Sequence, residues 1–540
     1  MTFSRRGFMG RSGTVALGFG YGVSFGMQAA VAAEGTDTLR MALSARGLRT
    51  IDPARSIQGA DEWAIIHIFD TLVEVPLGRF PQAPDEVQPS LAESWSANED
   101  STIWTFKLRP GVKFQKGYGE MTSADVAFSF NRLLNPDELG VRTALWQNLA
   151  SVGAPDDHTF VMHLKQPDPL WTMGPMLHHS ASTVSRKAFE EKGAEAFEKD
   201  PVGTGPYQLV NVAEDPSEGV LMEVNPDYWG PKPNIPLFQV RYIADTTART
   251  LALLSGDIQM MEGVRAPGWV PSIQTQAPDL HFDVASPGSF FTISFNLTVK
   301  PFDDVRVRQA CAYLIDRDQI AQAMAPISKR TFGMNPPAFP GGFNEDTIPA
   351  DVAYRLDIQK AKALLAEAGH PDGFQFSAYT SQREDYSSIM LMIQQLLRAG
   401  GIDMQLEMKD HTAFHADQAT GTNTIFQRSA AYPPVPTLAI SEQLTAANEV
   451  KADGTGGPNF SHYGVVIPGI DDMLKEAMAE PELDQRITKV QDIEMKFLTD
   501  MPLLPVVTNG YLIVRAANVD LGYNLESGYA HWRLTKATIG

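Results

Sequence analysis

Cysteine is almost absent from this sequence of 540 residues, in which Cys311 stands alone. A single cysteine cannot form an internal disulfide. There is also no Cys-x-x-Cys pair to hold an iron–sulfur cluster, a c-type haem or a zinc ribbon. Val307, Ala310, Cys311 and Leu314 have the spacing of one helix face. We therefore interpret Cys311 as a buried small apolar residue and not as a nucleophile.

Basic residues are also scarce, since 44 lysines and arginines face 64 aspartates and glutamates for a formal charge of -20. Nucleic-acid binding and polybasic membrane patches need the opposite balance, so we expect neither as a partner. The composition is otherwise that of a globular protein, with 43% hydrophobic and 20% charged residues. The length predicts about three or four domains' worth of core.

Long apolar runs are missing except near the start of the sequence. The paired Arg5 and Arg6 precede a glycine-rich apolar stretch over 12–29, and Ala30-Val31-Ala32 supplies a small-x-small cleavage site. This layout predicts a twin-arginine-type signal peptide over 1–33, cleaved after about Ala32 or Ala33. The alternative is a membrane anchor, which the glycines and the missing stop-transfer charges disfavour. We expect a soluble protein exported to the periplasm.

Catalytic and metal-binding motifs are absent as well. The sequence has no P-loop, no Gly-x-Gly-x-x-Gly after a strand and no Gly-x-Ser-x-Gly elbow. His411 and His415 share a helical spacing without the glutamate of a metalloprotease, and His178-His179 reads as a loop pair. The sequence therefore predicts no catalytic residues, no metal site and no cofactor. An exported cofactor-containing enzyme remains the alternative.

Hydrophobic patterning predicts an α/β fold. Trp104, Phe106 and Leu108 alternate within a predicted hairpin over 95–114, and 66–73 is expected to begin a helix. A strand over 374–379, a helix over 386–399 and a strand over 402–408 form a β-α-β unit with a parallel pair. An aspartate of the pair Asp303-Asp304 can cap a helix, and Asp357 is expected to start another.

Two segments rich in proline and glycine, 285–288 and 504–510, suggest crossings between two lobes. We expect lobe I to comprise 34–285 and 508–540, with an inserted subdomain over about 76–202. Lobe II would comprise 286–507, and a hinge would join the lobes.

A series of ordered motifs resembles the solute-binding proteins of bacterial ABC importers, family 5, which bind peptides, nickel complexes and opines. The resemblance rests on 52–54 (DPA), 89–96 (PSLAESWS), 104–114 (WTFKLRPGVKF), 122–132 (TSADVAFSFNR), 203–207 (GTGPY), 225–230 (NPDYWG) and 295–310 (FNLTVKPFDDVRVRQA). It implies a two-lobed periplasmic-binding-protein fold with an extra subdomain in the first lobe.

The same resemblance implies a binding protein and not an enzyme. Such a protein captures a peptide or a small carboxylate-bearing solute and delivers it to an ABC permease and its ATPase. We expect it to act as a monomer. A receptor or peptide-handling chaperone without a transporter is a further alternative.

Two arginines follow predicted strands, where ligands of open α/β sheets bind. Arg383 comes after the strand over 374–379, and Arg428 ends a strand beginning at Thr424. A guanidinium offers a rigid fork of donors to a carboxylate, although each arginine could equally serve a surface ion pair. By resemblance, peptide-binding members often hold a ligand carboxylate with an arginine in the loop of Arg383.

The next segment departs from the peptide-binding pattern. Those members commonly place an aspartate near the aromatic residue here, where it holds the α-amino group of the ligand. This sequence reads 429–434 as SAAYPP, with Tyr432 and no acid. The departure favours a carboxylate-bearing ligand without a free amine in the usual place. Tyr432, Ser44 and Phe291 are further candidate ligand contacts.

Overall fold

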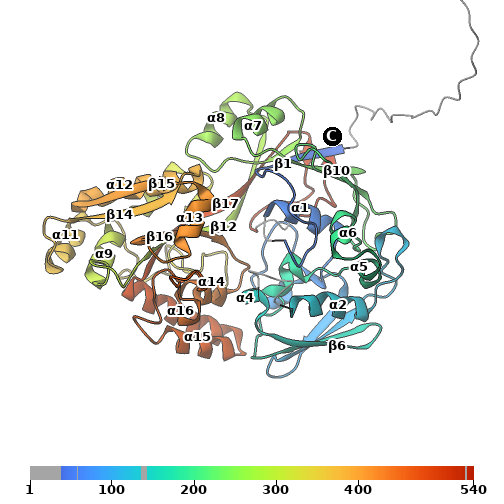
Figure 1. The fold of residues 1–540 in the computed structure, drawn as a ribbon, viewed down its shortest axis with the longest axis horizontal. Coiled ribbons are helices and arrows are strands. Elements are labelled where there is room, and N and C mark those ends of the chain that lie inside the picture. The colour runs from blue at the N-terminus through green and yellow to red at the C-terminus, as the bar shows by residue number, and fades with distance from the viewer. Residues whose placement is uncertain (1–37, 57–58, 136–142, 529–531) are drawn as a thin grey trace, which may run out of the picture. The chain divides into compact units, whose positions relative to one another are not determined.

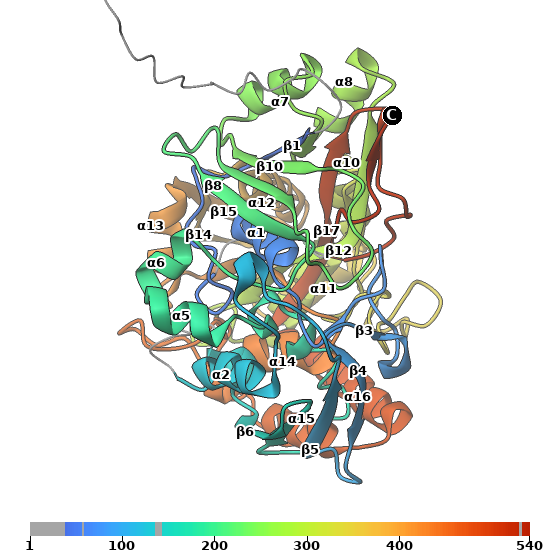
Figure 2. The same cartoon turned by 90° about the vertical axis from the view of Figure 1, so that its right-hand side faces the viewer.

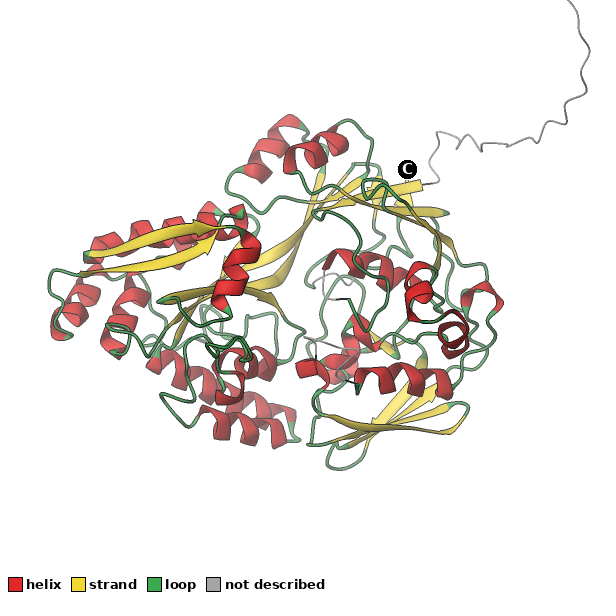
Figure 3. Ribbon diagram, viewed as in Figure 1, coloured by secondary structure: helices red, strands yellow, loops and turns green. Residues whose placement is uncertain are grey.

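The computed structural model describes residues 38–56, 59–135, 143–528 and 532–540. The predicted signal peptide lies outside these ranges. None of the helices in the described ranges has both the length and the hydrophobicity of a membrane span. The mixture of helices and strands confirms the predicted α/β class (Figure 3).

The largest sheet has nine strands, in the order β16-β12-β17-β11-β1-β10-β9-β8, with β13 beside β17. Their bounds are β1 (Thr38–Leu43), β8 (Tyr207–Val212), β9 (Val220–Val224), β10 (Leu237–Tyr242), β11 (Met260–Glu262), β12 (His281–Phe295), β13 (Ser328–Arg330), β16 (Ile425–Ala431) and β17 (Leu503–Arg515). Parallel and antiparallel pairs both occur, since β1 runs parallel to β10 whereas β12 and β17 are antiparallel.

Strands β12 and β17 are the longest in this sheet and lie side by side (Figures 1 and 2). Their pairing is interrupted between Ala285 and Ser289, around the Ser286-Pro287-Gly288 segment. One hydrophobic core draws mainly on residues 39–285 and 511–537, and a second draws mainly on 290–507. We call these the first core and the second core. The expected lobe limits stay a prediction.

A separate four-stranded antiparallel sheet contains the predicted hairpin. Its strands are β4 (Ala92–Ala97), β5 (Ile103–Leu108), β6 (Leu149–Asp156) and β7 (Thr159–Leu164), in the order β4-β5-β7-β6. Trp104, Phe106 and Leu108 all face the core, which confirms their alternation. Helix α2 (Ser123–Leu133) follows, and its start is fixed because the Thr122 N–H donates to Asp125 Oδ2 at 3.0 Å.

The predicted β-α-β unit is confirmed. Strands β14 (Phe374–Ser381) and β15 (Ile402–Lys409) pair in parallel throughout their length, and α12 (Glu384–Leu397) connects them. Helix α12 forms because Ile389, Ile393 and Leu397 repeat at helical spacing and are buried on one side.

The helix expected to begin in 66–73 is wrong in its position. Helix α1 instead spans Gly59–Ile68, and residues Val73–Glu74 form the short strand β2. Nearly all residues of α1 are buried, among them Asp61, Glu62 and His67. Because polar residues occupy buried positions here, the sequence shows no apolar stripe from which to place the helix.

The other helices surround these sheets (Figure 1). Of the two candidate aspartates, Asp304 caps α9 (Val305–Leu314), and Asp357 caps α11 (Ile358–Glu367). Cys311 is buried in α9 with 1% exposure, as predicted. The remaining bounds are α4 (Thr143–Trp146), α5 (Arg186–Lys192), α6 (Ala194–Lys199), α7 (Thr246–Leu254), α8 (Trp269–Gln276), α9 (Val305–Leu314), α10 (Arg317–Ala323), α11 (Ile358–Glu367), α13 (His411–Gln418), α14 (Pro436–Leu444), α15 (Ile470–Ala479), α16 (Leu483–Asp500), β3 (Gln88–Pro89), β18 (Val519–Asp520) and β19 (Thr538–Ile539).

Candidate functional site

Arg383 lies where β14 passes into α12, at the carboxyl end of the strand as predicted. Its Nη2 and Nε donate to Asp385 at 2.6 and 3.0 Å, and its Nη1 donates to His411 Nε2 at 3.3 Å. The side chain remains 47% exposed. An exposed guanidinium with one acidic partner is available to a second carboxylate.

Arg428 lies inside β16 (Ile425–Ala431) and not at the end of a strand as predicted, because the strand continues to Ala431 beside β12. Its Nη2 donates to Glu442 Oε1 at 2.6 Å. Burial alone would lower the pKa of Arg428, but Glu442 and Tyr432 together hold that pKa above its usual value. The Nε atom is buried and has no hydrogen-bond partner among the described residues. Arg428 therefore stays charged and has an unused donor.

Helix α13 places two histidines beside these arginines. The His411 and His415 rings lie 4.5 Å apart between centroids, and both contact the Tyr386 ring. Burial, together with the nearby His411, Arg383 and Arg428, lowers the pKa of His415 to about 4. Burial and Arg383 also lower the pKa of His411. The pair is therefore neutral at pH 7.

A third arginine acts on the same group of residues. Burial raises the pKa of Tyr386, whereas the charges of Arg383, Arg428 and Arg265 lower it. Arg265 follows β11 in the sequence and pairs with Glu262 at 3.3 Å. Arg383 lies over the Tyr386 ring, 5.4 Å from its centroid, and Arg428 and Arg265 lie near enough for their charges to act on the same tyrosine. We call Arg265, Arg383 and Arg428 the arginine cluster.

Ser44, another expected ligand contact, is exposed at the end of β1, where its N–H donates to Glu262 Oε2 at 3.0 Å. Ser44 and Arg265 therefore share Glu262 as a partner. This arrangement places Ser44 at the edge of the arginine cluster.

Tyr432 and Phe291 lie instead in the second core. Phe291 has no exposed surface, and Tyr432 packs against Phe290 while its Oη accepts from Gln443 Nε2 at 3.0 Å. Both side chains are committed to packing and have little exposed surface, and their contact with a ligand stays a prediction.

Sequence reasoning missed Arg265 and the three acidic partners, Glu262, Asp385 and Glu442. The missing acid in 429–434 is matched in space by Glu442, which α14 brings back to Arg428. Asp385 was within reach of sequence reasoning, because it stands two residues after Arg383. No local pattern connects Glu442 to Arg428 or Arg265 to Arg383.

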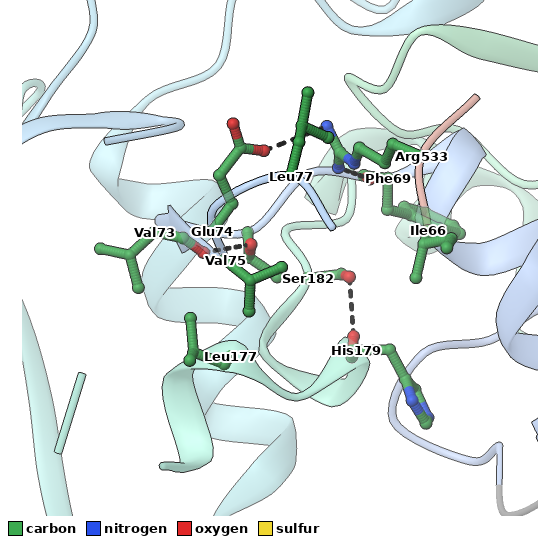
Figure 4. Close-up of a pocket in the computed structure, with 11 residues that line it drawn as sticks. Ile66, Phe69, Val73, Glu74, Val75, Leu77, Leu177, His179, Ser182 and Arg533 are labelled. Atoms are coloured by element: carbon green, nitrogen blue, oxygen red, sulfur yellow. Dashed lines mark hydrogen bonds and ion pairs between the residues drawn. The ribbon is translucent and has the colours of Figure 1, made fainter. Parts of the chain in front are cut away.

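A small pocket of about 50 Å³ lies elsewhere, against α1 and β2 (Figure 4). Arg533 lines it and pairs with Asp70 at 2.7 Å and with Glu74 at 3.6 Å. Ligand sites usually measure about 300–1,000 Å³, so this pocket is too small for an organic solute. Arg533 also donates to the Phe69 carbonyl at 2.9 Å, which fastens the C-terminal tail to the first core.

Comparison with known proteins identifies relatives over most of the chain. The glutathione-binding protein GsiB of Salmonella typhi is 31% identical over 329 residues, covering 60% of this chain and 62% of its own. The dipeptide-binding protein of Escherichia coli is 30% identical over 333 residues, covering 57% and 59%. The chain thus matches less than two thirds of the length of these curated relatives.

The solved structure of MoaA from A. tumefaciens R10, in complex with mannopinic acid, covers 94% of this chain and all of its own, with 26% identity and a TM-score of 0.77. The chain therefore has the two-lobed α/β fold of periplasmic binding proteins. The model of bacterial extracellular solute-binding proteins, family 5, matches residues 86–449. On this match across more than half of its length, the chain belongs to family 5 of the bacterial extracellular solute-binding proteins.

Proposed function

We propose that this protein is the periplasmic receptor of an ABC importer and captures a small carboxylate-bearing organic solute. The observation that carries the proposal is the arginine cluster, whose three guanidiniums all act on Tyr386. Guanidiniums bind carboxylates through paired hydrogen bonds, so three of them from separate segments favour a ligand that carries a carboxylate.

The acidic partners refine the class of ligand. Each arginine of the cluster already pairs with Glu262, Asp385 or Glu442. A ligand carboxylate that replaces one of these partners leaves an acid available for a cationic or hydroxyl group of the same ligand. Solutes that combine a carboxylate with such a group fit this arrangement better than simple carboxylic acids.

Two kinds of solute satisfy that description, and the relatives illustrate both. MoaA was solved with mannopinic acid, whereas other relatives are named for dipeptides and glutathione. We favour a carboxylate-bearing compound without a free α-amino group, because 429–434 lacks the expected acid. An ordinary peptide is the second candidate, supported by the carboxylate of Glu442 beside Arg428.

Binding would favour closure of the two lobes. Arg383 and Arg428 belong to the proposed lobe II (286–507), while Arg265 and Ser44 belong to the proposed lobe I. A solute that contacts both groups stabilises the closed state by its differential affinity for that state. The hinge would lie where 285–288 and 504–510 cross, and the twin-arginine-type signal would deliver the monomer to the periplasm, where a permease and its ATPase receive the solute.

The direct test is thermal unfolding of the signal-free protein with a panel of ligands. The panel contains a dipeptide, the same dipeptide with an acetylated amine, mannopinic acid and a neutral sugar. A ligand at a hundred times its dissociation constant adds about 2.7 kcal/mol to the stability of the native state. We expect stabilisation by mannopinic acid or by the acetylated dipeptide and none by the sugar.

Stabilisation by the free dipeptide alone would move the assignment to peptide import, with Glu442 as the amine-binding acid. Matched titrations with Arg383→Ala separate the site from the ligand class, because loss of binding assigns the carboxylate to this arginine. Stabilisation by the sugar alone would overturn the carboxylate proposal.

A further inference from the structure

A buried cluster of metal-binding side chains lies away from the arginine cluster. Glu62 on α1, together with His178 and His179, places one donor atom from each residue within 4.8 Å of the others. Glu62 and His179 are only 7% and 3% exposed. The Nδ1 atom of His179 lies 3.2 Å from Oε1 of Glu62.

The two histidine rings are held close together and in defined positions. Their centroids are 4.1 Å apart, within a short turn that follows the helical segment Pro175–Leu177. The His178 Nδ1 atom accepts from the Ser180 N–H at 3.1 Å and lies 2.7 Å from Ser180 Oγ. Ser180 Oγ accepts in turn from Trp146 Nε1 at 3.0 Å. Neighbouring groups therefore fix the ring of His178.

Only one of the two ring nitrogens of His179 has a polar partner among the described residues. Its Nε2 atom is buried and has no hydrogen-bond partner among the described residues. Its imidazole points away from Glu74, Val75 and Leu177, which line the small pocket (Figure 4). His179 is one of the residues that line the pocket, and its Nδ1 atom faces Glu62.

The donor set fits a first-row divalent cation. Zinc binds imidazole nitrogen at about 2.0–2.1 Å and carboxylate oxygen at about 2.0–2.2 Å, so neighbouring ligands of a tetrahedral site lie about 3.3 Å apart. The Glu62–His179 separation of 3.2 Å already matches that spacing. Two nitrogens and one carboxylate oxygen are a donor set that zinc accepts, with a fourth position for water.

We propose that Glu62, His178 and His179 bind one first-row divalent transition-metal ion, with Zn²⁺ as the reference ion. The metal would join α1 to the turn at 178–181 and so link two segments of the first core. This site is independent of the proposed solute and adds a function that the arginine cluster does not supply. The proposed metal site differs from the prediction made from the sequence, in which His178-His179 was only a pair of loop histidines.

The test measures Zn²⁺ binding to the full signal-free chain by calorimetry, after metal is removed with a chelator. We expect one Zn²⁺ per chain, and the visible absorption of bound Co²⁺ reports tetrahedral coordination. Glu62→Gln keeps the size of the side chain and an acceptor for His179 but removes the charge. His178→Asn keeps a capping acceptor for Ser180. Each variant should weaken Zn²⁺ binding at least about tenfold.

The matched control removes the other close histidine pair, with His411→Asn and His415→Asn combined. This control should bind Zn²⁺ as the unaltered chain does. The proposal is overturned if the unaltered chain binds no Zn²⁺, if Glu62→Gln binds it undiminished, or if the control loses it. Circular dichroism of Glu62→Gln verifies folding, so a loss of binding in that variant reports on the site itself.

Discussion

Arginines of the second core and arginines of the arginine cluster both carry a positive charge, but they differ in the partners that accept their hydrogen bonds. Arg317 is 2% exposed and donates to the carbonyls of Thr331, Pro505 and Tyr354 at 3.1, 3.1 and 3.2 Å. Arg383 is 47% exposed and pairs with a carboxylate. Backbone carbonyls cannot leave, whereas the half-buried carboxylate of Asp385 can be exchanged for one on a ligand. The partner of an arginine thus separates a structural role from a binding role.

The buried arginine should produce the largest loss of stability. Arg317→Met leaves several buried carbonyls without donors, and we expect the free energy of unfolding to fall by about 3–5 kcal/mol. Urea unfolding at constant pH measures this change. An unaltered midpoint and slope would mean that the carbonyls find other donors. Arg317 would then not be the structural arginine with which Arg383 is compared.

The exposed arginine should show the reverse pattern. Arg383→Ala should weaken binding of the carboxylate ligand by about 1.5–3 kcal/mol, as expected for a hydrogen bond to a charged group. Its free energy of unfolding should change by less than about 1 kcal/mol, because exposed ion pairs contribute little. Calorimetry and urea unfolding of one preparation compare the two values. A stability loss as large as that of Arg317→Met would make Arg383 structural.

Histidines extend the comparison to pH. Burial lowers the pKa of His67 to about 3, and its Nε2 accepts from the Leu534 N–H at 3.0 Å. Below about pH 6.5 the imidazole of His67 binds a proton in the unfolded chain but stays neutral in the folded chain. Stability from this residue is therefore complete above pH 6.5 and lost as the pH falls toward 3.

Between pH 7 and 5 this residue alone should remove about 2 kcal/mol of unfolding free energy. His67→Gln should reduce that pH dependence, and urea unfolding of both proteins at the two pH values measures the difference. Equal pH dependence in the two proteins would mean that His67 takes up its proton while folded.

The smallest effect is expected for a fully solvated ion pair. Lys199 and Glu195 lie on one helix face 3.0 Å apart, with side chains 75% and 89% exposed. Lys199→Ala should change the free energy of unfolding by less than about 0.5 kcal/mol. Lys199→Ala serves as the matched control for the arginine variants. A larger loss in urea unfolding would show that exposure alone does not decide how much a charged residue contributes to stability.

The sequence predicted those parts of the fold in which one side of an element is buried. Trp104, Phe106 and Leu108 alternate, and Ile389, Ile393 and Leu397 repeat at helical spacing, so hairpin and β-α-β unit were both foreseen. Helix α1 was misplaced because burial encloses nearly all of its residues.

The candidate site was predicted only in part, for a different reason. Arg383 follows β14, and the end of that strand is visible in the sequence, whereas Arg428 lies inside β16. The pairing of Arg428 with Glu442 and the approach of Arg265 depend on how distant segments pack, which no local periodicity encodes. Ligand contact by Tyr432 and Phe291 stays a prediction, because aromatic residues near strand ends serve cores and sites equally well.

The shared strands β12 and β17 also set an order of assembly during synthesis. The second core draws on residues between 290 and 507, apart from Phe80, and these emerge from the ribosome as one continuous stretch. The first core needs Tyr511, Ile513, Trp532 and Leu534, which are made after the residues of the second core. The first core is therefore translated first but completed last. A ribosome that stops near residue 507 releases a chain in which only the second core has all of its residues.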